Sequence, residues 1–318
     1  YSVPGTYGVN PKSKLFENDG QGNFIDITEQ KAYDFKDLGL VKDAVWVDID
    51  EDDILDLVVV GEWMSPQFFR NTGRRLELFE TNLKDLHGMY NAILAVDLND
   101  DGQKELLFGN NGYNFKLKPT TDKPIKLFVN DFDDNGTIEQ IITRTIDGKD
   151  KPYQLKRELV KQLPEIKKDN MSFETFAEQS VQDLFGQDKT DKGIVKYLTE
   201  IGSFAAFKSE TGQYDIKHLP KEVQLSSIET MATLELDGRL MIITGGNFYH
   251  FKPQYCRLDA SDTNIFEYKN DEFHILSDME TDVKGEVRAI VKAKDKAKNT
   301  YLIFGRNDDK PVILKYAP

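Results

Sequence analysis

The sequence predicts an all-β protein: a β-propeller of four-stranded antiparallel blades, interrupted by a small helical insertion. Two observations support this prediction. Acidic segments of one spacing recur at residues 48–56, 97–105 and 131–139, each between stretches rich in β-forming residues, and hairpin patterns recur along the whole chain. A four-strand unit that repeats every roughly 40–60 residues is more typical of a propeller than of a solenoid.

The three acidic segments share one arrangement of side-chain oxygens. Each has carboxylates or amides at positions 1, 3, 5 and 9 of a single loop. With a backbone carbonyl at position 7, such a loop can wrap Ca²⁺, which prefers six to eight oxygen ligands. The spacing therefore predicts calcium-loop hairpins with the following ligands: Asp48, Asp50, Asp52, Ile54 and Asp56; Asp97, Asn99, Asp101, Gln103 and Glu105; Asp131, Asp133, Asn135, Thr137 and Glu139.

Two other interpretations of these loops are open. Helix–loop–helix calcium sites begin in the same way, but they need flanking helices and a Glu at position 12, where this chain has Val59, Phe108 and Ile142. Solvated acidic turns are the other alternative, because Asp, Asn and Gly dominate ordinary turns. Three loops with the same spacing and the same β-rich flanks favour calcium. In the first loop Asp53 replaces the glycine of position 6, since Asp tolerates a positive φ.

A second pattern supports the repeat. An apolar strand that ends at a glycine is followed each time by polar or aromatic residues, and it alternates with an outer hairpin that turns at Asn, Gly or Asp. The later inner turns lose their acidic side chains, so we expect no metal there. The inner segments are 56–63, 105–111, 240–248 and 301–307, and the outer hairpins are 15–24, 68–76, 206–214 and 266–273.

Residues 153–202 interrupt the repeat with a helical pattern. Leucines recur every four residues up to Leu163, and a second apolar stripe runs from Phe173 to Leu184. The stripe is expected to cover the side of the propeller, with a partner-binding face as the alternative. The predicted organisation is blades with three calcium loops over 1–152, a helical insertion over 153–202, and blades with degenerate loops over 203–318.

Composition excludes several classes of function. With 41 basic and 55 acidic side chains, the net charge is −14, which argues against a nucleic-acid partner. The sequence has no apolar run of 18 residues, so no membrane-spanning segment is expected. Its single cysteine permits no internal disulfide, and no catalytic motif stands out, so the chain is predicted not to be an enzyme. Calcium loops of this kind need millimolar calcium, which points to an extracellular location.

Several longer stretches together resemble the FG-GAP/VCBS repeat proteins. More narrowly, they resemble the C-terminal part of Bacteroidota surface proteins of the ASPIC/UnbV (cartilage acidic protein-like) group. The resemblance covers most of residues 14–318, and it implies a calcium-stabilised propeller of about seven blades, exported to the cell surface. The chain departs from the family loop at Asp53, Glu105 and Glu139. The stretches that carry the resemblance are 45–50, 61–64, 109–118, 130–136, 161–164, 246–249 and 257–261.

Strand direction predicts where a ligand would bind. The acidic loops lie at one end of the blades, so the segments after the glycines gather at the opposite end, near the propeller axis. We expect Trp63, Tyr113, Asn247 and Tyr249 to contact a ligand there, with packing between blades as the alternative for the aromatic residues.

The resulting functional prediction is a cell-surface binding or scaffold module without catalytic activity. Its partner would be a glycan or a protein, within an outer-membrane assembly, and the chain would be lipid-anchored through a segment outside this sequence. The alternative is an accessory part of a polysaccharide-degrading hydrolase or lyase.

Overall fold

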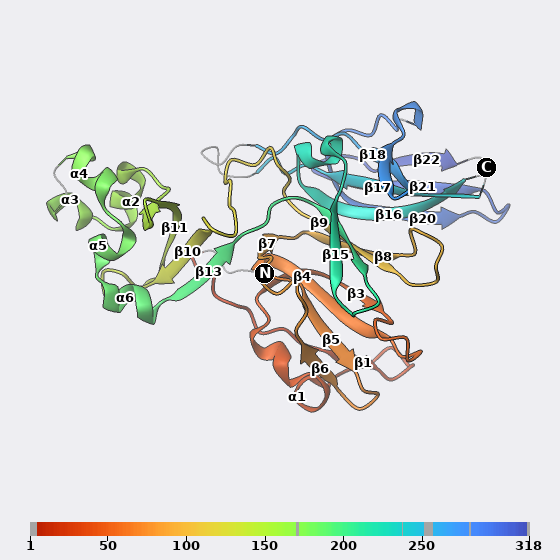
Figure 1. Cartoon of the computed structure of the whole chain (residues 1–318), viewed down its shortest axis with the longest axis horizontal. Coiled ribbons are helices and arrows are strands. Elements are labelled where there is room, and N and C mark those ends of the chain that lie inside the picture. Colours follow the sequence, from red (N-terminus) through yellow and green to blue (C-terminus); the bar gives the residue numbers. More distant parts are fainter. Residues whose placement is uncertain (1–4, 170–171, 237, 251–256, 280, 317–318) are drawn as a thin grey trace.

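The computed structural model describes residues 5–169, 172–236, 238–250, 257–279 and 281–316 (Figure 1). The described chain is mostly β and forms several small antiparallel sheets, as the all-β prediction requires. Strands also flank all three acidic loops, which confirms that no helix–loop–helix sites are present at these positions.

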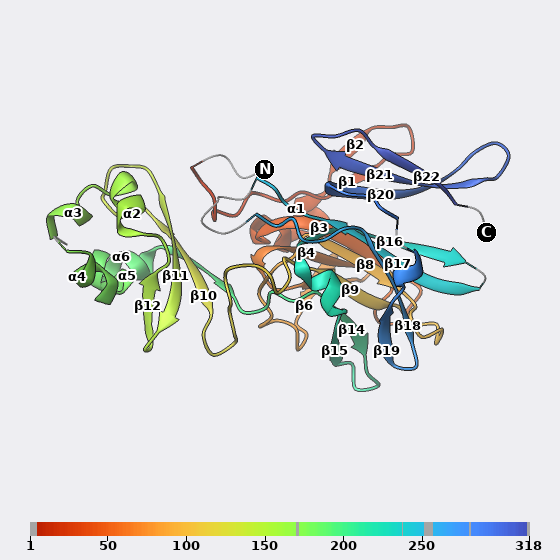
Figure 2. The same ribbon diagram turned by 90° about the horizontal axis from the view of Figure 1, so that it is seen from above.

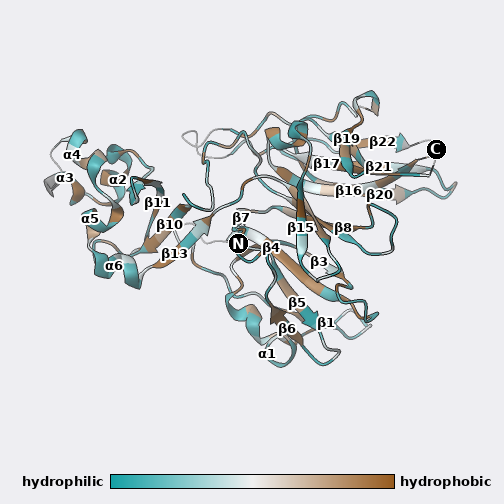
Figure 3. Cartoon of the chain, in the orientation of Figure 1, coloured by the Kyte–Doolittle hydropathy of each residue, from teal (hydrophilic) through white to brown (hydrophobic). Residues whose placement is uncertain are grey.

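The first large sheet is rich in β-branched and aromatic residues, and hydrophobic stretches run along its strands (Figure 3). Its second strand is buried along nearly its whole length, as expected for a strand that is covered on both faces. The strands are β3 (Leu40–Val47), β4 (Asp56–Met64), β5 (Gln67–Asn71) and β6 (Leu76–Phe79), in that order, with β7 (Gly88–Met89) beside β4. A small hairpin and two short helices precede them: β1 (Phe16–Asn18), β2 (Phe24–Asp26), α1 (Thr28–Lys31) and η1 (Tyr33–Asp37).

The second sheet is interrupted in sequence but continuous in space. The chain leaves it after its second strand and returns about a hundred residues later to add the remaining two, so that Phe108 lies opposite Phe204. Its strands, in spatial order, are β8 (Ala92–Val96), β9 (Glu105–Gly109), β14 (Phe204–Lys208) and β15 (Tyr214–His218).

The segment between β9 and β14 builds a separate lobe, seen at the left of Figures 1 and 2. Its sheet has the order β12-β11-β10-β13, and five short helices are described beside it. The elements are β10 (Ile125–Asn130), β11 (Glu139–Ile146), β12 (Lys149–Pro152), α2 (Lys156–Gln162), α3 (Ile166–Asp169), α4 (Phe173–Glu178), α5 (Val181–Phe185), α6 (Gln187–Lys192) and β13 (Ile194–Leu198).

The helices of this lobe cover its own sheet. Leu159, Leu163 and Phe176 are buried in one cluster with Phe128 and Ile141 of the sheet. The predicted apolar stripe is therefore a core face, and it packs on β10 and β11 rather than on the side of the other sheets. The helical part is also shorter than the 153–202 segment predicted from sequence, because its end is the strand β13.

Two further sheets complete the chain. One of them has the order β16-β17-β18-β19, and the other has the order β20-β21-β22. Their strands are β16 (Ile228–Leu236), β17 (Arg239–Gly246), β18 (Asn264–Lys269), β19 (Glu272–Ile275), β20 (Glu286–Lys294), β21 (Thr300–Asn307) and β22 (Val312–Tyr316). The 3₁₀ helices η2 (Lys221–Leu225) and η4 (Ser277–Met279) lie between strands.

The first strands of successive sheets outside the lobe lie side by side (Figure 2). β3 contacts β8, β8 contacts β16, and β16 contacts β20. Apolar side chains fill each space between neighbouring sheets, and this burial is the main stabilising contribution to the fold. Buried pairs in the successive clusters are Val60 with Phe108, Leu107 with Ile242, and Ile243 with Phe304.

The recurring glycine has a steric explanation at two of these strands. A β-carbon at Gly61 would lie 2.1 Å from the carbonyl oxygen of Leu40, and one at Gly246 would lie 1.7 Å from that of Ser227. Both distances are well inside van der Waals contact. Since the chain entering the first strand passes directly over the end of the second, only glycine fits there.

Candidate metal centres and binding groove

The three acidic loops have nearly the same backbone hydrogen bonding. At position 1, Oδ2 of Asp48 accepts from the position-6 amide of Asp53 at 2.9 Å. The same bond joins Asp97 to Gly102 at 2.9 Å and Asp131 to Gly136 at 2.7 Å. The position-1 carboxylate therefore closes each turn in the same way, although the three sequences differ.

Two further contacts repeat in every loop. The position-5 side chain accepts from the position-7 amide, at 2.8, 2.7 and 2.7 Å in the first, second and third loops. The position-9 carboxylate accepts from the position-2 amide, and these bonds join Asp56 to Ile49 at 3.1 Å, Glu105 to Leu98 at 2.6 Å and Glu139 to Phe132 at 3.0 Å. The side chains of positions 1, 5 and 9 are thus held by the turn itself.

The turns also require residues that tolerate the left-handed region. Asp53 has a φ of 65°, as expected for the position that Gly102 and Gly136 occupy in the other loops. Position 4 is left-handed as well, with φ values of 64° at Glu51 and 60° at Asp100. This second position was not predicted. The aspartates at position 4 of the second and third loops, Asp100 and Asp134, were a signal for it, whereas Glu51 of the first loop was not.

Position 3 is where the loops leave a carboxylate oxygen without a partner. Oδ1 of Asp50 and Oδ1 of Asp133 are buried and accept no hydrogen bond. The other oxygen of Asp50 pairs with Nε of Arg70 at 2.7 Å. A buried carboxylate oxygen without a partner is costly, so a cation that bound it would stabilise the loop.

The second loop differs at this position because it carries an amide. Oδ1 of Asn99 accepts from the backbone of Asp101 at 3.2 Å, and its Nδ2 donates to the Asp101 carboxylate at 2.8 Å. The carboxylates of the other two loops converge on one point: ligand oxygens lie within 4.8 Å of one another in the groups Asp48, Asp50 and Asp52, and Asp131, Asp133 and Glu139. These two loops are the best candidate metal centres.

The position-9 carboxylates are strongly affected by their surroundings. Burial raises the pKa of Glu105 to about 7, and the negative charges of Asp101 and Asp97 act in the same direction. Burial likewise raises the pKa of Asp56 and of Glu139. A bound cation would oppose these effects, because it favours the charged form of each carboxylate.

The predicted ligand patch at the glycine-ended strands needs correction. Trp63 is only 3% exposed and lies in a cluster with Leu127 and Leu198 of the inserted lobe. Its indole Nε1 donates to the Tyr7 hydroxyl at 2.8 Å. The lobe and the N-terminal segment cover this end of β4, so Trp63 is a packing residue and not a surface contact.

Asn247 is also buried and has a structural role. Its Nδ2 donates to the carbonyl of Ser261 at 2.6 Å and to that of Gly285 at 3.1 Å, which ties the loop after β17 to two other segments. Tyr113 is 44% exposed and lies beside His218, whereas Tyr249 is half-buried beneath Arg257. The two tyrosines have separate surroundings, and the predicted patch of four contacts does not form.

A groove at the acidic-loop end of the sheets was not predicted. It has a volume of about 780 Å³ and lies between the β8-β9-β14-β15 sheet and the β16-β17-β18-β19 sheet, with the second acidic loop in one wall. The rings of Phe207 and Tyr268 lie 5.0 Å apart along it, and Nζ of Lys217 lies within 5.2–5.3 Å of both ring centres. Phe207 and Tyr268 both lie in predicted outer hairpins, 206–214 and 266–273. Their matching places in the repeat were the sequence signal from which this groove could have been predicted.

Two ion pairs line this groove. Arg239 contacts Glu267 at 2.9 Å, and Lys217 contacts Asp271. Asp97, Asp100 and Asp215 also line the groove, so acidic residues outnumber basic ones around the aromatic pair.

Comparison with known proteins does not assign a family. No family model matches this chain, and no curated protein matches its sequence. Within the described residues, none of the helices is both long enough and apolar enough to cross a membrane.

Proposed function

We propose that this chain is a calcium-stabilised β-propeller, or a large part of one, of the FG-GAP/VCBS repeat type and related to the ASPIC/UnbV group. The side-by-side first strands and the glycine-ended second strands support this arrangement. The observation that carries the calcium assignment is the unpartnered position-3 oxygen of Asp50 and Asp133, in loops whose position-1, position-5 and position-9 side chains accept hydrogen bonds from the turn. All-oxygen ligands at this spacing suit Ca²⁺.

The role proposed for calcium is structural. Each acidic loop closes a hairpin whose strands enter the core, and its carboxylates repel one another without a cation. Loops of moderate affinity fill at the calcium concentrations found outside cells. An extracellular or outer-membrane surface location follows as part of the proposal, with a lipid anchor supplied by a segment outside this sequence.

The binding partner proposed for the groove is a glycan, with a protein as the competing partner. Sugar rings stack on aromatic side chains such as Tyr268 and Phe207, while neighbouring polar groups bind hydroxyls. The pairing of Lys217 and Arg239 with acidic residues, and the further acidic residues of the lining, favour a neutral ligand over an anionic one.

The alternative, an accessory part of a hydrolase or lyase, receives less support. An active site built from the acidic loops is disfavoured, because their carboxylates are held in the turns, where Asp48 and Asp97 close their loops. In the groove, Glu267 pairs with Arg239. A carboxylate that binds a cation cannot also serve as a general acid.

Calcium titration monitored by calorimetry tests the metal assignment. The unaltered chain should bind calcium, and Asp50→Asn and Asp133→Asn should each weaken binding at one site. Asp122→Asn, an exposed acid outside the loops, is the matched control and should change nothing. If the chain binds no calcium at millimolar concentration, the assignment is wrong.

A glycan array tests the groove independently of the metal. Binding to neutral polysaccharides should be lost in Tyr268→Ala and kept in Tyr113→Ala, which alters an exposed tyrosine outside the groove. Equal binding by both variants would rule out the groove as the site. Binding to no glycan would favour a protein partner.

A further inference from the structure

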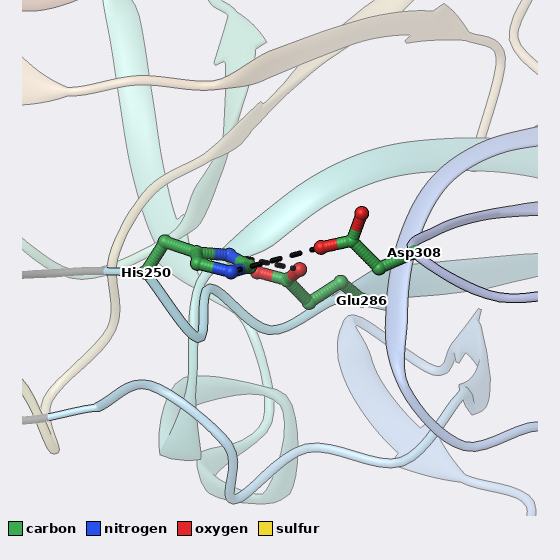
Figure 4. A group of neighbouring side chains, drawn as sticks. All are labelled: His250, Glu286 and Asp308. Carbon is green, nitrogen blue, oxygen red and sulfur yellow. Dashed lines mark ion pairs between the residues drawn. The ribbon is translucent and has the colours of Figure 1, made fainter.

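A group of three side chains far from the acidic loops combines one imidazole with two carboxylates (Figure 4). His250 follows β17, Glu286 is the first residue of β20, and Asp308 follows β21. Nδ1 of His250 lies 3.6 Å from Oε2 of Glu286, and its Nε2 lies 3.6 Å from Oδ2 of Asp308. One potential ligand atom from each residue lies within 4.8 Å of the other two.

Glu286 is the fixed member of the group. Its side chain is 1% exposed. Oε1 accepts from Nη2 of Arg288 at 3.0 Å and from the amide of Tyr249, while Oε2 accepts from Nδ2 of Asn307 at 2.9 Å. Such contacts orient a carboxylate in advance, as the outer partners of metal ligands do. The oxygen that faces His250 is the one that the arginine does not hold.

His250 and Asp308 are the movable members. Their side chains are 63% and 74% exposed, so the group is open to solvent on this side. The 3.6 Å separations are longer than hydrogen bonds. The two carboxylates face different ring nitrogens, so rotation of the exposed His250 and Asp308 side chains is needed to bring one nitrogen towards both.

We propose that His250, Glu286 and Asp308 form a site for a divalent transition-metal cation, with Zn²⁺ as the best fit. Imidazole is a ligand that zinc accepts readily and that Ca²⁺ does not prefer, so this site differs in chemistry from the oxygen-only loops. Three protein ligands leave at least one position for water or for a ligand from solution.

The position of the site gives it a distinct consequence. The acidic loops each close one hairpin, whereas these residues belong to two successive sheets. A metal held here would cross-link the segment after β17 to both β20 and β21. Binding should therefore stabilise the contact between the last two sheets.

Calorimetric titration with zinc tests the proposal, in millimolar calcium so that the acidic loops are filled. All proteins carry Cys256→Ser, which removes the thiol as a competing ligand. One zinc ion should bind per chain, His250→Ala should abolish this binding, and Asp308→Asn should weaken it by at least about tenfold. Both residues are exposed, so the variants should fold, as circular dichroism can verify.

His218→Ala is the matched control. His218 also faces a glutamate, Glu200 at 3.4 Å, and its replacement should leave zinc binding unchanged. Absence of zinc binding by the unaltered site would overturn the proposal. So would binding that survives His250→Ala, or binding that His218→Ala removes.

Discussion

The turns of the hairpins β10–β11 and β20–β21 are stabilised in different ways. In the first, the loop 131–139 places several carboxylates together and leaves Oδ1 of Asp133 without a partner. In the second, Oδ1 of Asp295 accepts from the Asn299 amide at 2.9 Å, and its Oδ2 accepts from Nδ2 of the same residue at 2.7 Å. One turn has an excess of negative charge that a cation would balance, and the other is complete with neutral donors.

Removal of calcium is expected to have the largest effect, because it should destabilise the hairpins with acidic loops and leave the hairpin β20–β21 unchanged. At free calcium about 100 times the dissociation constant, one site stabilises the folded chain by about 2.7 kcal/mol. Excess EGTA should therefore lower the melting temperature by at least about 5 °C. Calorimetry can measure the shift, with excess magnesium as a control for ionic strength. An unchanged melting temperature would mean that these turns are simply solvated.

The pH dependence of the calcium-free protein should follow the raised pKa of Glu105. Below its ordinary value of 4.5, both folded and unfolded forms are protonated. As the pH rises from 4.5 to about 7, the unfolded chain loses this proton first, so the free energy of unfolding should fall across that range. Urea melts in EGTA at pH 4.5–8 measure this. Glu105→Gln should flatten the slope, and saturating calcium should suppress it.

The effect of replacing the position-3 acid on the free energy of unfolding should change sign when calcium is removed. In calcium, Asp133→Asn should destabilise the chain, since a charged ligand is lost. In EGTA it should be neutral or stabilise by up to about 1–3 kcal/mol, because a buried unpartnered charge is removed. Asp295→Asn, in the turn that Asn299 closes, should lower stability equally in both conditions. A calcium-independent effect of Asp133→Asn would remove the distinction between the two hairpins.

The smallest effect is expected at position 6 of the first loop. Asp53 holds a φ of 65° that glycine adopts without strain. Asp53→Gly should therefore change stability by less than about 1 kcal/mol and leave calcium affinity almost unaltered. Thermal melts and calcium titration can both be compared with the unaltered chain. A large loss of calcium affinity would show that the Asp53 carboxylate itself takes part in binding.

The local features of this molecule could be predicted from the sequence. The all-β class follows from apolar stretches and turn residues, and the acidic loops take their shape from hydrogen bonds within nine residues, such as the one from the Gly136 amide to Asp131. The helical pattern after residue 153 also produced helices, since periodicity of four residues specifies a local conformation.

Only the tertiary structure decided which surfaces stay open. The third acidic loop lies in a lobe inserted between β9 and β14, and that lobe buries Trp63. The groove around Phe207 and Tyr268, and the meeting of His250 with Glu286 and Asp308, likewise depend on residues far apart in sequence. Spacing along a chain fixes what neighbouring residues can do together, but burial depends on which distant segment packs above them.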